Sequence, residues 1–401
     1  MASRLLKFKS ERFDFSGSLD DSKSIVNRLL IVQSYFPSAE VHFHSQAEDV
    51  VYLRQALQNL EENKTNFDLG AGGTSLRFFL ARLSRRPGAY VVRAHPALLK
   101  RPHEDLYKTL EQLGTTITPL DDQRIKVHVQ GWQGVREVRV KSDVSSQFAS
   151  AIILNSWDLH HSLTVFLEGE LASASFLELT ERVCRNAGMQ LHEHPRQRVI
   201  ESGQKLSMPR LKSEVDASSV FTLACFALLY GKLKINPLVN QLGQPDFAFL
   251  DFFRSEGIEF TLHNEEFSLS KQTHVRPVQI DIKNCPDLFP VLCAWLSFCP
   301  GEHKIFGAPH LVSKESNRIL KTYELLTLAG IAAWPLSDGM IVHGQACPQK
   351  KSFVFDPAHD HRMAFAAAVF AFGGFRVTLT DIDVVKKSFP QFWTILGLQH
   401  D

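Results

Sequence analysis

The chain has 401 residues, 44% of them hydrophobic and 22% charged, which is typical of a globular protein large enough for two ordinary domains. A formal net charge of +1 argues against a general nucleic-acid surface. The sequence has no evident signal peptide or membrane-spanning apolar run, and its six cysteines form no CxxC pair. We therefore expect free thiols in a cytoplasmic protein that binds neither nucleic acid nor membrane.

The first part of the chain predicts a strand within residues 1–20 and a helix over residues 21–36. Polar residues crowd the first turn of this helix, so Lys23, Ser24 and Arg28 lie near its positive end. A second helix is predicted over residues 48–60. The pattern predicts an anion-binding position at the start of the first helix.

Residues 68–77, with the sequence DLGAGGTSLR, place four small residues before a helix that is predicted to start at Thr74. Glycines let backbone N–H groups converge on a ligand, and the helix adds its positive end, so the segment suits a phosphate or carboxylate. It has neither the lysine of a P-loop nor the order of a dinucleotide fingerprint. A glycine-rich turn with an exposed arginine stays open as the alternative.

Similar polar helix starts recur further along the chain, each followed by a second helix about 30 residues later. They fall near residues 23, 74, 145, 217, 287 and 361. Strand-like segments such as AYVVRA, LTVFLEG and FRVTLT alternate with these helices. The sequence therefore predicts six α/β units in two domains of three, with crossings at Asp20–Asp21 and Glu214–Val215, and helix starts that could converge on a cleft between the domains.

Nine short segments resemble, in order, the enolpyruvyl transferases, and among them the EPSP synthase (3-phosphoshikimate 1-carboxyvinyltransferase) family: SKSIVNR, LGAGGTSLR, KRP, VSSQF, DASS, CPDLFP, KESNR, DHRMA and KSFP. This resemblance covers nearly the whole chain. It implies a two-domain inside-out α/β barrel in which residues 1–20 and 215–401 form one pseudo-threefold domain and residues 21–214 form the other. The active site is expected in the interdomain cleft of a monomer.

The reaction implied by the resemblance moves the enolpyruvyl group of phosphoenolpyruvate onto the 5-hydroxyl of shikimate 3-phosphate and releases phosphate. No metal and no organic cofactor is expected. Glyphosate, which competes with phosphoenolpyruvate in this family, is expected to inhibit. Two anionic substrates held together explain why a nearly neutral protein would gather cations on its helix starts.

The resemblance also assigns residues to roles. Asp287 is expected to accept the proton of the 5-hydroxyl, Glu315 to protonate C3, and Lys23 to contact both substrates. The expected shikimate 3-phosphate set is Lys23, Ser24, Arg28, Ser145, Ser146, Gln147, Ser173, Asp287 and Lys314. The expected phosphoenolpyruvate set is Lys23, Gly73, Arg77, Arg101, Gln147, Arg318, His361, Arg362 and Lys387. Helix capping, surface charge or an i, i+4 ion pair would explain several of these residues without any function.

Some positions depart from the commonest pattern of the family. Asp20 and Asp21 place negative charge beside an anion site, and Ala71, Ala97 and Phe176 replace side chains that would bind substrate. His310 and Val312 also differ from the residues that usually precede the Lys314-Glu315 pair. Each lost hydrogen bond should cost about 1 kcal/mol, which predicts weaker binding rather than lost chemistry.

Two alternatives to this function stay open. The related enzyme that loads UDP-N-acetylglucosamine usually carries a reactive cysteine in the loop before the Arg-Pro pair, but residues 95–100 contain none. A catalytically silent homologue that binds a phosphorylated metabolite or a partner protein is the other. The presence of Lys23, Asp287, Glu315, Arg362 and Lys387 argues against it.

Overall fold

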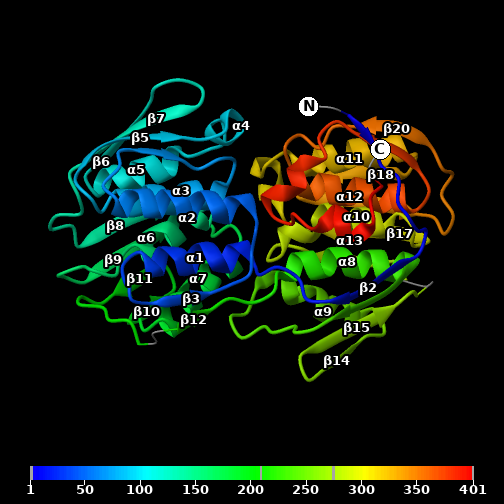
Figure 1. Cartoon of the computed structure of the whole chain (residues 1–401), viewed down its shortest axis with the longest axis horizontal. Helices are drawn as coiled ribbons and strands as arrows, with labels where there is room; N and C mark the ends of the chain where they lie inside the picture. Colours follow the sequence, from blue (N-terminus) through cyan, green and yellow to red (C-terminus); the bar gives the residue numbers. More distant parts are fainter. Residues whose placement is uncertain (1–2, 208–209, 273–275, 400–401) are drawn as a thin grey trace. The chain divides into compact units, whose positions relative to one another are not determined.

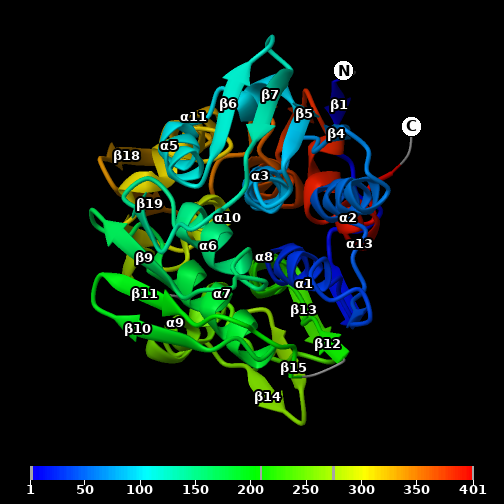
Figure 2. The ribbon, with the colours of Figure 1, turned by 90° about the vertical axis from the view of Figure 1, so that its left-hand side faces the viewer.

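The computed structural model describes residues 3–207, 210–272 and 276–399. The chain divides into two compact units (Figures 1 and 2). The first unit comprises residues 1–20 and 215–401, and the second comprises residues 21–214. Among the described residues, no helix is long and apolar enough to cross a membrane.

The second unit has three mutually contacting helices at its centre, with strands outside them (Figure 2). The central helices are α1 (Lys23–Gln33), α3 (Gly73–Leu83) and α6 (Gln147–Leu154). The further helices are α2 (Glu48–Glu61), α4 (Pro96–Leu99), α5 (Glu104–Gln112) and α7 (Ala174–Asn186). One sheet has the spatial order β4 (Asn66–Asp68), β5 (Gly88–Arg93), β7 (Arg124–Val129) and β6 (Thr115–Pro119). A second has the order β8 (Glu137–Lys141), β9 (Leu163–Glu168), β11 (Gln197–Ile200) and β10 (Leu191–His194). A third pairs β3 (Glu40–His42) with β12 (Arg210–Lys212).

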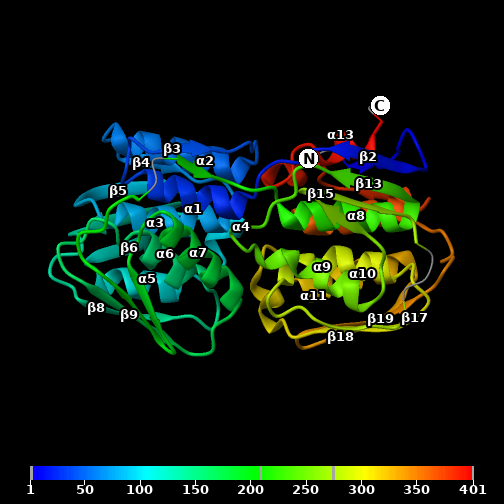
Figure 3. The same ribbon diagram turned by 90° about the horizontal axis from the view of Figure 1, so that it is seen from below.

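The first unit repeats this plan, with α10 (Phe289–Leu296) packed against α8 (Ala217–Tyr230) and α12 (His361–Phe372). Figure 1 shows these three helices, and Figure 3 shows α8 and α10 side by side. Its other helices are α9 (Ala248–Ser255), α11 (Arg318–Ala329), α13 (Phe392–Leu396) and the 3₁₀ segments η1 (Pro245–Phe247), η2 (Pro286–Leu288), η3 (Pro309–Ser313) and η4 (Asp383–Lys387). One sheet has the spatial order β2 (Phe13–Gly17), β13 (Gly231–Ile235), β15 (Glu266–Ser270) and β14 (Thr261–His263). A second has the order β16 (Gln279–Asp281), β17 (Gly301–Phe306), β19 (Gly339–Gly344) and β18 (Ala332–Leu336). A third has the order β1 (Arg4–Leu5), β21 (Arg376–Leu379) and β20 (Ser352–Phe355).

The four-stranded sheets share one topology. Each contains a parallel pair, namely β4 with β5, β8 with β9, β2 with β13, and β16 with β17, and continues through antiparallel neighbours. This shared order confirms the predicted α/β repeat. The described strands form separate open sheets around the helices rather than one closed ring of strands.

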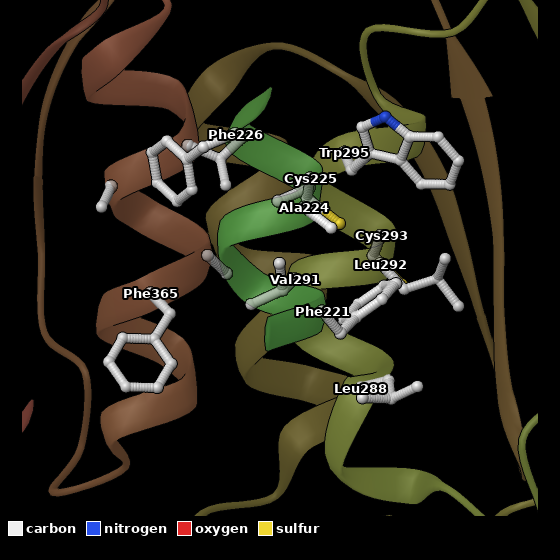
Figure 4. Packing of buried hydrophobic residues seen from close by; sticks show 14 of the residues in the cluster. Phe221, Ala224, Cys225, Phe226, Leu288, Val291, Leu292, Cys293, Trp295 and Phe365 are labelled. Carbon is white, nitrogen blue, oxygen red and sulfur yellow. The ribbon is translucent and has the colours of Figure 1, made fainter. Parts of the chain in front are cut away.

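Helices that are apolar on all sides form the core of the first unit (Figure 4). Phe221 and Phe226 of α8 lie in the same core as Trp295 of α10 and Phe365 of α12, all with side chains at most 2% exposed. A helix without a polar face is stable only when it is surrounded by other elements. The polar residues of these helices are therefore concentrated at their starts, where backbone N–H groups lack partners within the helix.

Single residues set the boundaries of three segments. The segment before Arg101 contains the short helix α4, whose start is capped by His95 Nδ1 accepting from Ala97 N at 3.2 Å. Helix α11 begins at Arg318, because Asn317 caps it by accepting from Leu320 N at 3.2 Å. The last helical segment is split into η4 and α13, and Pro390 lies between them.

The pairing of β2 with β13 joins the N-terminal segment to the first unit. A Cβ on Gly231 would lie 1.8 Å from the carbonyl oxygen of Phe13 across this pair. We predict that Gly231→Ala separates the strands and lowers the free energy of unfolding by about 3 kcal/mol. Gly203 has open space around it, so Gly203→Ala should cost only the strain of its left-handed backbone, about 1 to 2 kcal/mol. Equal losses in urea unfolding would contradict the steric explanation.

Candidate active site

Polar side chains gather at the starts of the central helices in both units. In the second unit, α1 begins at Lys23, α3 at Gly73 and α6 at Gln147, and Ser173 precedes α7. In the first unit, Asp287 lies in η2 before α10, and His361 and Arg362 begin α12. Sequence periodicity predicted these positions correctly, to within about one turn of helix.

Lys23 is fixed by an acid that was not predicted as a site residue. Its Nζ donates to Asp49 Oδ2 at 2.8 Å, and the Asp49 side chain is 4% exposed. The carbonyl of Asp49 accepts from Ser75 Oγ at 2.7 Å, which ties α2 to α3. Gly72 allows this approach, because a Cβ there would lie 2.7 Å from Asp49 Oδ1. The ammonium is therefore held at the start of α1 by an acid of α2 that is itself fixed by α3.

Arg77 is the centre of a group that we call the Arg77 cluster, made up of Thr74, Arg77, Pro102, His103, Gln147 and Phe148. Arg77 Nη1 donates to Gln147 Oε1 at 2.7 Å, and Gln147 Nε2 donates to Thr74 Oγ1 at 3.0 Å. The guanidinium lies 5.2 Å from the centroid of the Phe148 ring. The structure thus joins two predicted site residues, Arg77 and Gln147, from different repeats.

Arg101 lies against the glycine segment. A Cβ on Gly73 would be 2.8 Å from Arg101 Nη1, so the absence of a side chain at residue 73 leaves room for this guanidinium. The preceding loop residue Ala97, which departs from the family pattern, donates through its backbone to His95 as described above. Gly73 and Arg101, both predicted to contact phosphoenolpyruvate, are therefore direct neighbours.

Arg28 is buried without an acidic partner among the described residues. It is 2% exposed and donates to three neutral oxygens, Thr180 Oγ1 at 2.8 Å, Ser24 O at 2.6 Å and Phe176 O at 3.0 Å. Burial lowers the pKa of its guanidinium to about 9. A buried cation surrounded by neutral dipoles is poised to gain stability from a bound anion.

The serine pair before α6 lies in the same unit. The hydroxyl of Ser145 accepts from Gln147 N at 3.2 Å, so it caps the helix as capping alone would predict. The hydroxyl of Ser146, at the N-cap position, makes no cap hydrogen bond, and Ser146 is 3% exposed. Ser173 has φ of 52°, a left-handed conformation that turns the chain into α7. Capping therefore accounts for Ser145 but not for Ser146.

In the first unit, charged side chains form what we call the Asp287 cluster: Asp287, Glu315, Arg318, Asp360, Arg362 and Lys387. Arg318 Nη1 donates to Asp287 Oδ1 at 2.6 Å, and Arg362 Nη2 donates to Asp287 Oδ2 at 2.7 Å. Arg318 Nη2 also donates to Glu315 Oε2 at 2.9 Å, and Lys387 Nζ lies 3.7 Å from Glu315 Oε1. Five predicted site residues from four segments are thus joined by ion pairs.

Asp360 accepts hydrogen bonds from two arginine residues of the Asp287 cluster, and it was not predicted as a site residue. Its side chain is fully buried, and its Oδ2 accepts from Arg318 Nε at 2.8 Å. Its Oδ1 accepts from the backbone N–H of Arg362 at 3.0 Å, which caps α12. One carboxylate therefore orients both arginines. Its place directly before His361 in the DHRMA segment was the available sequence signal.

The charges of the cluster control its titration. Burial would raise the pKa of Asp287, but Arg362, Arg318 and Lys314 outweigh it and hold that pKa far below its usual value. Burial would lower the pKa of Arg318, but Asp360, Asp287 and Glu315 raise it above its usual value. His310 is kept neutral, because burial and then Lys314 lower its pKa to about 3. Asp287 is therefore ionised at neutral pH.

Asp246 is a further buried acid that the sequence did not reveal. It lies in η1, which Gln244 ties to α8 by accepting from Ala217 N at 3.2 Å and donating to Val215 O at 2.8 Å. Burial, and then the charge of Asp287, raise the pKa of Asp246 to about 8. A neutral acid at this position adds no second negative charge near Asp287.

The remaining predicted residues are placed as follows. His361 begins α12, and its ring packs edge-on against Phe365 at 5.6 Å. Lys314 is an electrostatic neighbour of Asp287. The two acids that depart from the family pattern have structural contacts: Asp20 Oδ1 accepts from Gln391 at 3.2 Å, and Asp21 Oδ2 accepts from His44 N at 2.8 Å.

Among the residues that the structure describes, no group of three or more His, Cys, Asp or Glu side chains could hold a metal ion.

Comparison with known proteins identifies the fold. Solved structures show that the fold is that of the enolpyruvyl transferases: EPSP synthase of Acinetobacter baumannii superposes with a TM-score of 0.76 at 20% identity over 99% of both chains. The enolpyruvyl transferase NikO of Streptomyces tendae gives 0.72 at 16% identity over 98% of this chain and 97% of that one. These likenesses establish the fold.

Sequence comparison defines the family within this fold. Residues 38–396 match the family described as EPSP synthase (3-phosphoshikimate 1-carboxyvinyltransferase). The 3-phosphoshikimate 1-carboxyvinyltransferase of Syntrophobacter fumaroxidans is 31% identical over 81% of this chain and 78% of its own length, and that of Pyrococcus abyssi is 27% identical over 96% and 91%. The chain belongs to the EPSP synthase family and is an enzyme.

The contact between Gly73 and Arg101 generates a prediction. Gly73→Ala should displace the flexible tip of Arg101 and raise the KM for phosphoenolpyruvate by about threefold or more, with little change in stability. Steady-state kinetics of Gly73→Ala, Arg101→Met and the double variant measure the coupling. If Gly73→Ala acts through Arg101, it adds nothing in the Arg101→Met background. Fully additive effects would show a separate cause.

Proposed function

We propose that the protein transfers the enolpyruvyl group of phosphoenolpyruvate to the 5-hydroxyl of shikimate 3-phosphate and releases phosphate, in the shikimate pathway of aromatic amino-acid biosynthesis. Membership of the EPSP synthase family supports the reaction. The single observation that carries the chemistry is the carboxylate of Asp287, ionised and held between Arg318 and Arg362. Residues proposed to bind substrate lie in each of the two units.

The proposed reaction has two steps. First, the 5-hydroxyl oxygen bonds to C2 of phosphoenolpyruvate, losing its proton to Asp287, while C3 gains a proton from Glu315. The resulting tetrahedral intermediate then breaks its C2–O bond to phosphate, C3 returns its proton to Glu315, and the proton taken up by Asp287 passes to the leaving phosphate. Lys387, 3.7 Å from Glu315, would meet the leaving phosphate, and Lys314 would assist at the sugar ring.

The two arginines that hold Asp287 also limit its strength as a base. Both of its oxygens accept from arginines, and these bonds hold its pKa low, so its affinity for a proton is weak. A bound phosphate or carboxylate of phosphoenolpyruvate would compete for Arg318 and Arg362. Release of one oxygen would then raise the basicity of Asp287 at the moment when the substrate is in place, which couples binding to proton transfer.

The shikimate 3-phosphate site would be formed mainly in the second unit. Arg28 is the strongest candidate there, because it is buried with only neutral partners among the described residues. Ser24, Ser145, Ser146, Gln147 and Ser173 would add neutral hydrogen bonds, and Lys23 would reach both substrates. An anion at these helix starts would gain from the helix dipoles and from charge-assisted hydrogen bonds.

The phosphoenolpyruvate site would combine Arg77, Arg101 and Gln147 with Arg318, Arg362 and His361. Competition by glyphosate at this site is part of the proposal, as are a monomeric state and a cytoplasmic location. The location is supported by free cysteines, five of which are buried. Phosphate release with phosphoenolpyruvate and shikimate 3-phosphate, compared with UDP-N-acetylglucosamine, tests the function. No release with shikimate 3-phosphate from a folded protein would reject it.

The Asp287 cluster generates a prediction for the chemical step. Asp287→Ala should lower kcat by about 10²- to 10⁴-fold, because no other group takes the hydroxyl proton. Binding of shikimate 3-phosphate, measured by calorimetry, should stay within about threefold of the parent value. Asp251→Ala, at an exposed acid paired with Arg254, is the matched control and should leave both quantities unchanged. A near-normal kcat would remove Asp287 from the mechanism.

Arg28 generates a second prediction. Arg28→Met keeps an unbranched apolar stem but removes the guanidinium and its charge, so shikimate 3-phosphate should bind at least about tenfold more weakly. The free energy of unfolding without ligand should fall by no more than about 1 kcal/mol, because the neutral partners do not offset the cost of burying the charge. Calorimetry and denaturant unfolding measure the two effects. Unchanged affinity in a stable variant would contradict the role.

A further inference from the structure

His103 is a buried residue of the Arg77 cluster to which the proposed reaction assigns no role. It follows Arg101-Pro102, precedes α5 and is 2% exposed. Its Nε2 lies 2.9 Å from Leu98 O, in the short helix α4 just before Arg101. Its Nδ1 lies 3.4 Å from Arg77 Nε. The ring therefore touches the two segments that hold the arginines of the proposed phosphoenolpyruvate site.

These two contacts are compatible with only one form of the ring. A carbonyl oxygen can only accept, so Nε2 must carry the hydrogen that is donated to Leu98 O. Nε of Arg77 can only donate, so Nδ1 must be unprotonated and accept. Burial, and then the charges of Arg77 and Arg101, lower the pKa of His103 to about 3, although the hydrogen bond to Leu98 O acts in the opposite direction. The neutral Nε2–H form thus persists at all pH values at which the enzyme would work.

Arg77 is oriented by neutral acceptors on each of its nitrogens. Nε donates to His103 Nδ1, Nη1 to Gln147 Oε1 at 2.7 Å, and Nη2 to Pro102 O at 3.4 Å. Each of these three acceptors is neutral, so these contacts orient the guanidinium without adding a negative charge beside it. The ring of His103 is itself held by stacking on Tyr107 at 5.9 Å with an interplanar angle of 13°.

We propose that His103 is a positioning residue that aligns Arg77 and the loop of Arg101 for the anionic groups of phosphoenolpyruvate. The proposal rests on the proposed function, and it assigns to His103 an effect on phosphoenolpyruvate and not on shikimate 3-phosphate. His103 contacts no reacting atom. It acts by supplying Arg77 with an acceptor that carries no negative charge, whereas a carboxylate at the same position would pair with Arg77 and compete with the substrate.

Two variants of nearly equal size test whether Nδ1 of His103 matters as the acceptor for Arg77. His103→Leu and His103→Asn both lose the donor to Leu98 O, but only asparagine places an oxygen near the former Nδ1. We expect His103→Leu to raise the KM for phosphoenolpyruvate by about tenfold, with kcat and the KM for shikimate 3-phosphate changed by less than about threefold. His103→Asn should recover most of the loss.

His303 offers a matched control in the first unit. It is also buried, and its Nε2 lies 2.8 Å from a backbone carbonyl, that of Cys299. His303→Leu should lower stability to a similar degree and leave the KM for phosphoenolpyruvate unchanged. Equal KM values for His103→Leu and His103→Asn, or the same rise in His303→Leu, would overturn the proposal. An inactive parent protein would instead reject the proposed function.

The tautomer gives a readout that needs no variant and no turnover. Nitrogen-15 chemical shifts of the histidines in the whole parent protein should show His103 neutral, with hydrogen on Nε2, throughout pH 5 to 8. The assignment can use the absence of one signal set in His103→Asn. A ring protonated at pH 6, or one with its hydrogen on Nδ1, would overturn the proposal even if every variant failed to fold.

Discussion

Burial of helices that are apolar on all sides is the constraint on which the rest of the structure depends. Helices α8, α10 and α12 present no polar face, so sheets and further helices must surround them. Their ends are then the places where unpaired N–H groups and polar side chains can gather. The packing of the core and the location of the chemistry thus follow from the same requirement, repeated in both units.

Within this frame, electrostatics is organised differently in the two clusters. Around Asp287, buried acids and arginines neutralise one another, and Asp360 fixes the geometry of both arginines. Around Arg28 and Arg77, the described contacts come from neutral oxygens and a neutral imidazole. The first arrangement suits proton transfer that is switched on by substrate, and the second suits the binding of anions.

Much of the fold could be predicted from sequence, because the polar starts and apolar bodies of the helices repeat locally. The same local signals placed Lys23, Gly73, Gln147 and Arg362 at or next to helix starts. Partners brought in by tertiary packing gave no such signal: Asp49 meets Lys23 from a different helix, and His103 meets Arg77 across 26 residues. Helix boundaries at Asn317 and Pro390 depended on single residues that overrode the periodic pattern.

The pairing of β2 with β13 and of β1 with β21 has a consequence for synthesis on the ribosome. Residues 21–214 are contiguous, so the second unit is complete as soon as they have emerged. The strands of residues 4–17 need partners made more than 200 residues later, so they must wait, unpaired, through the translation of that whole unit. Cotranslational order is therefore inverted for these two strands, which are synthesised before the second unit but reach their native neighbours only after it.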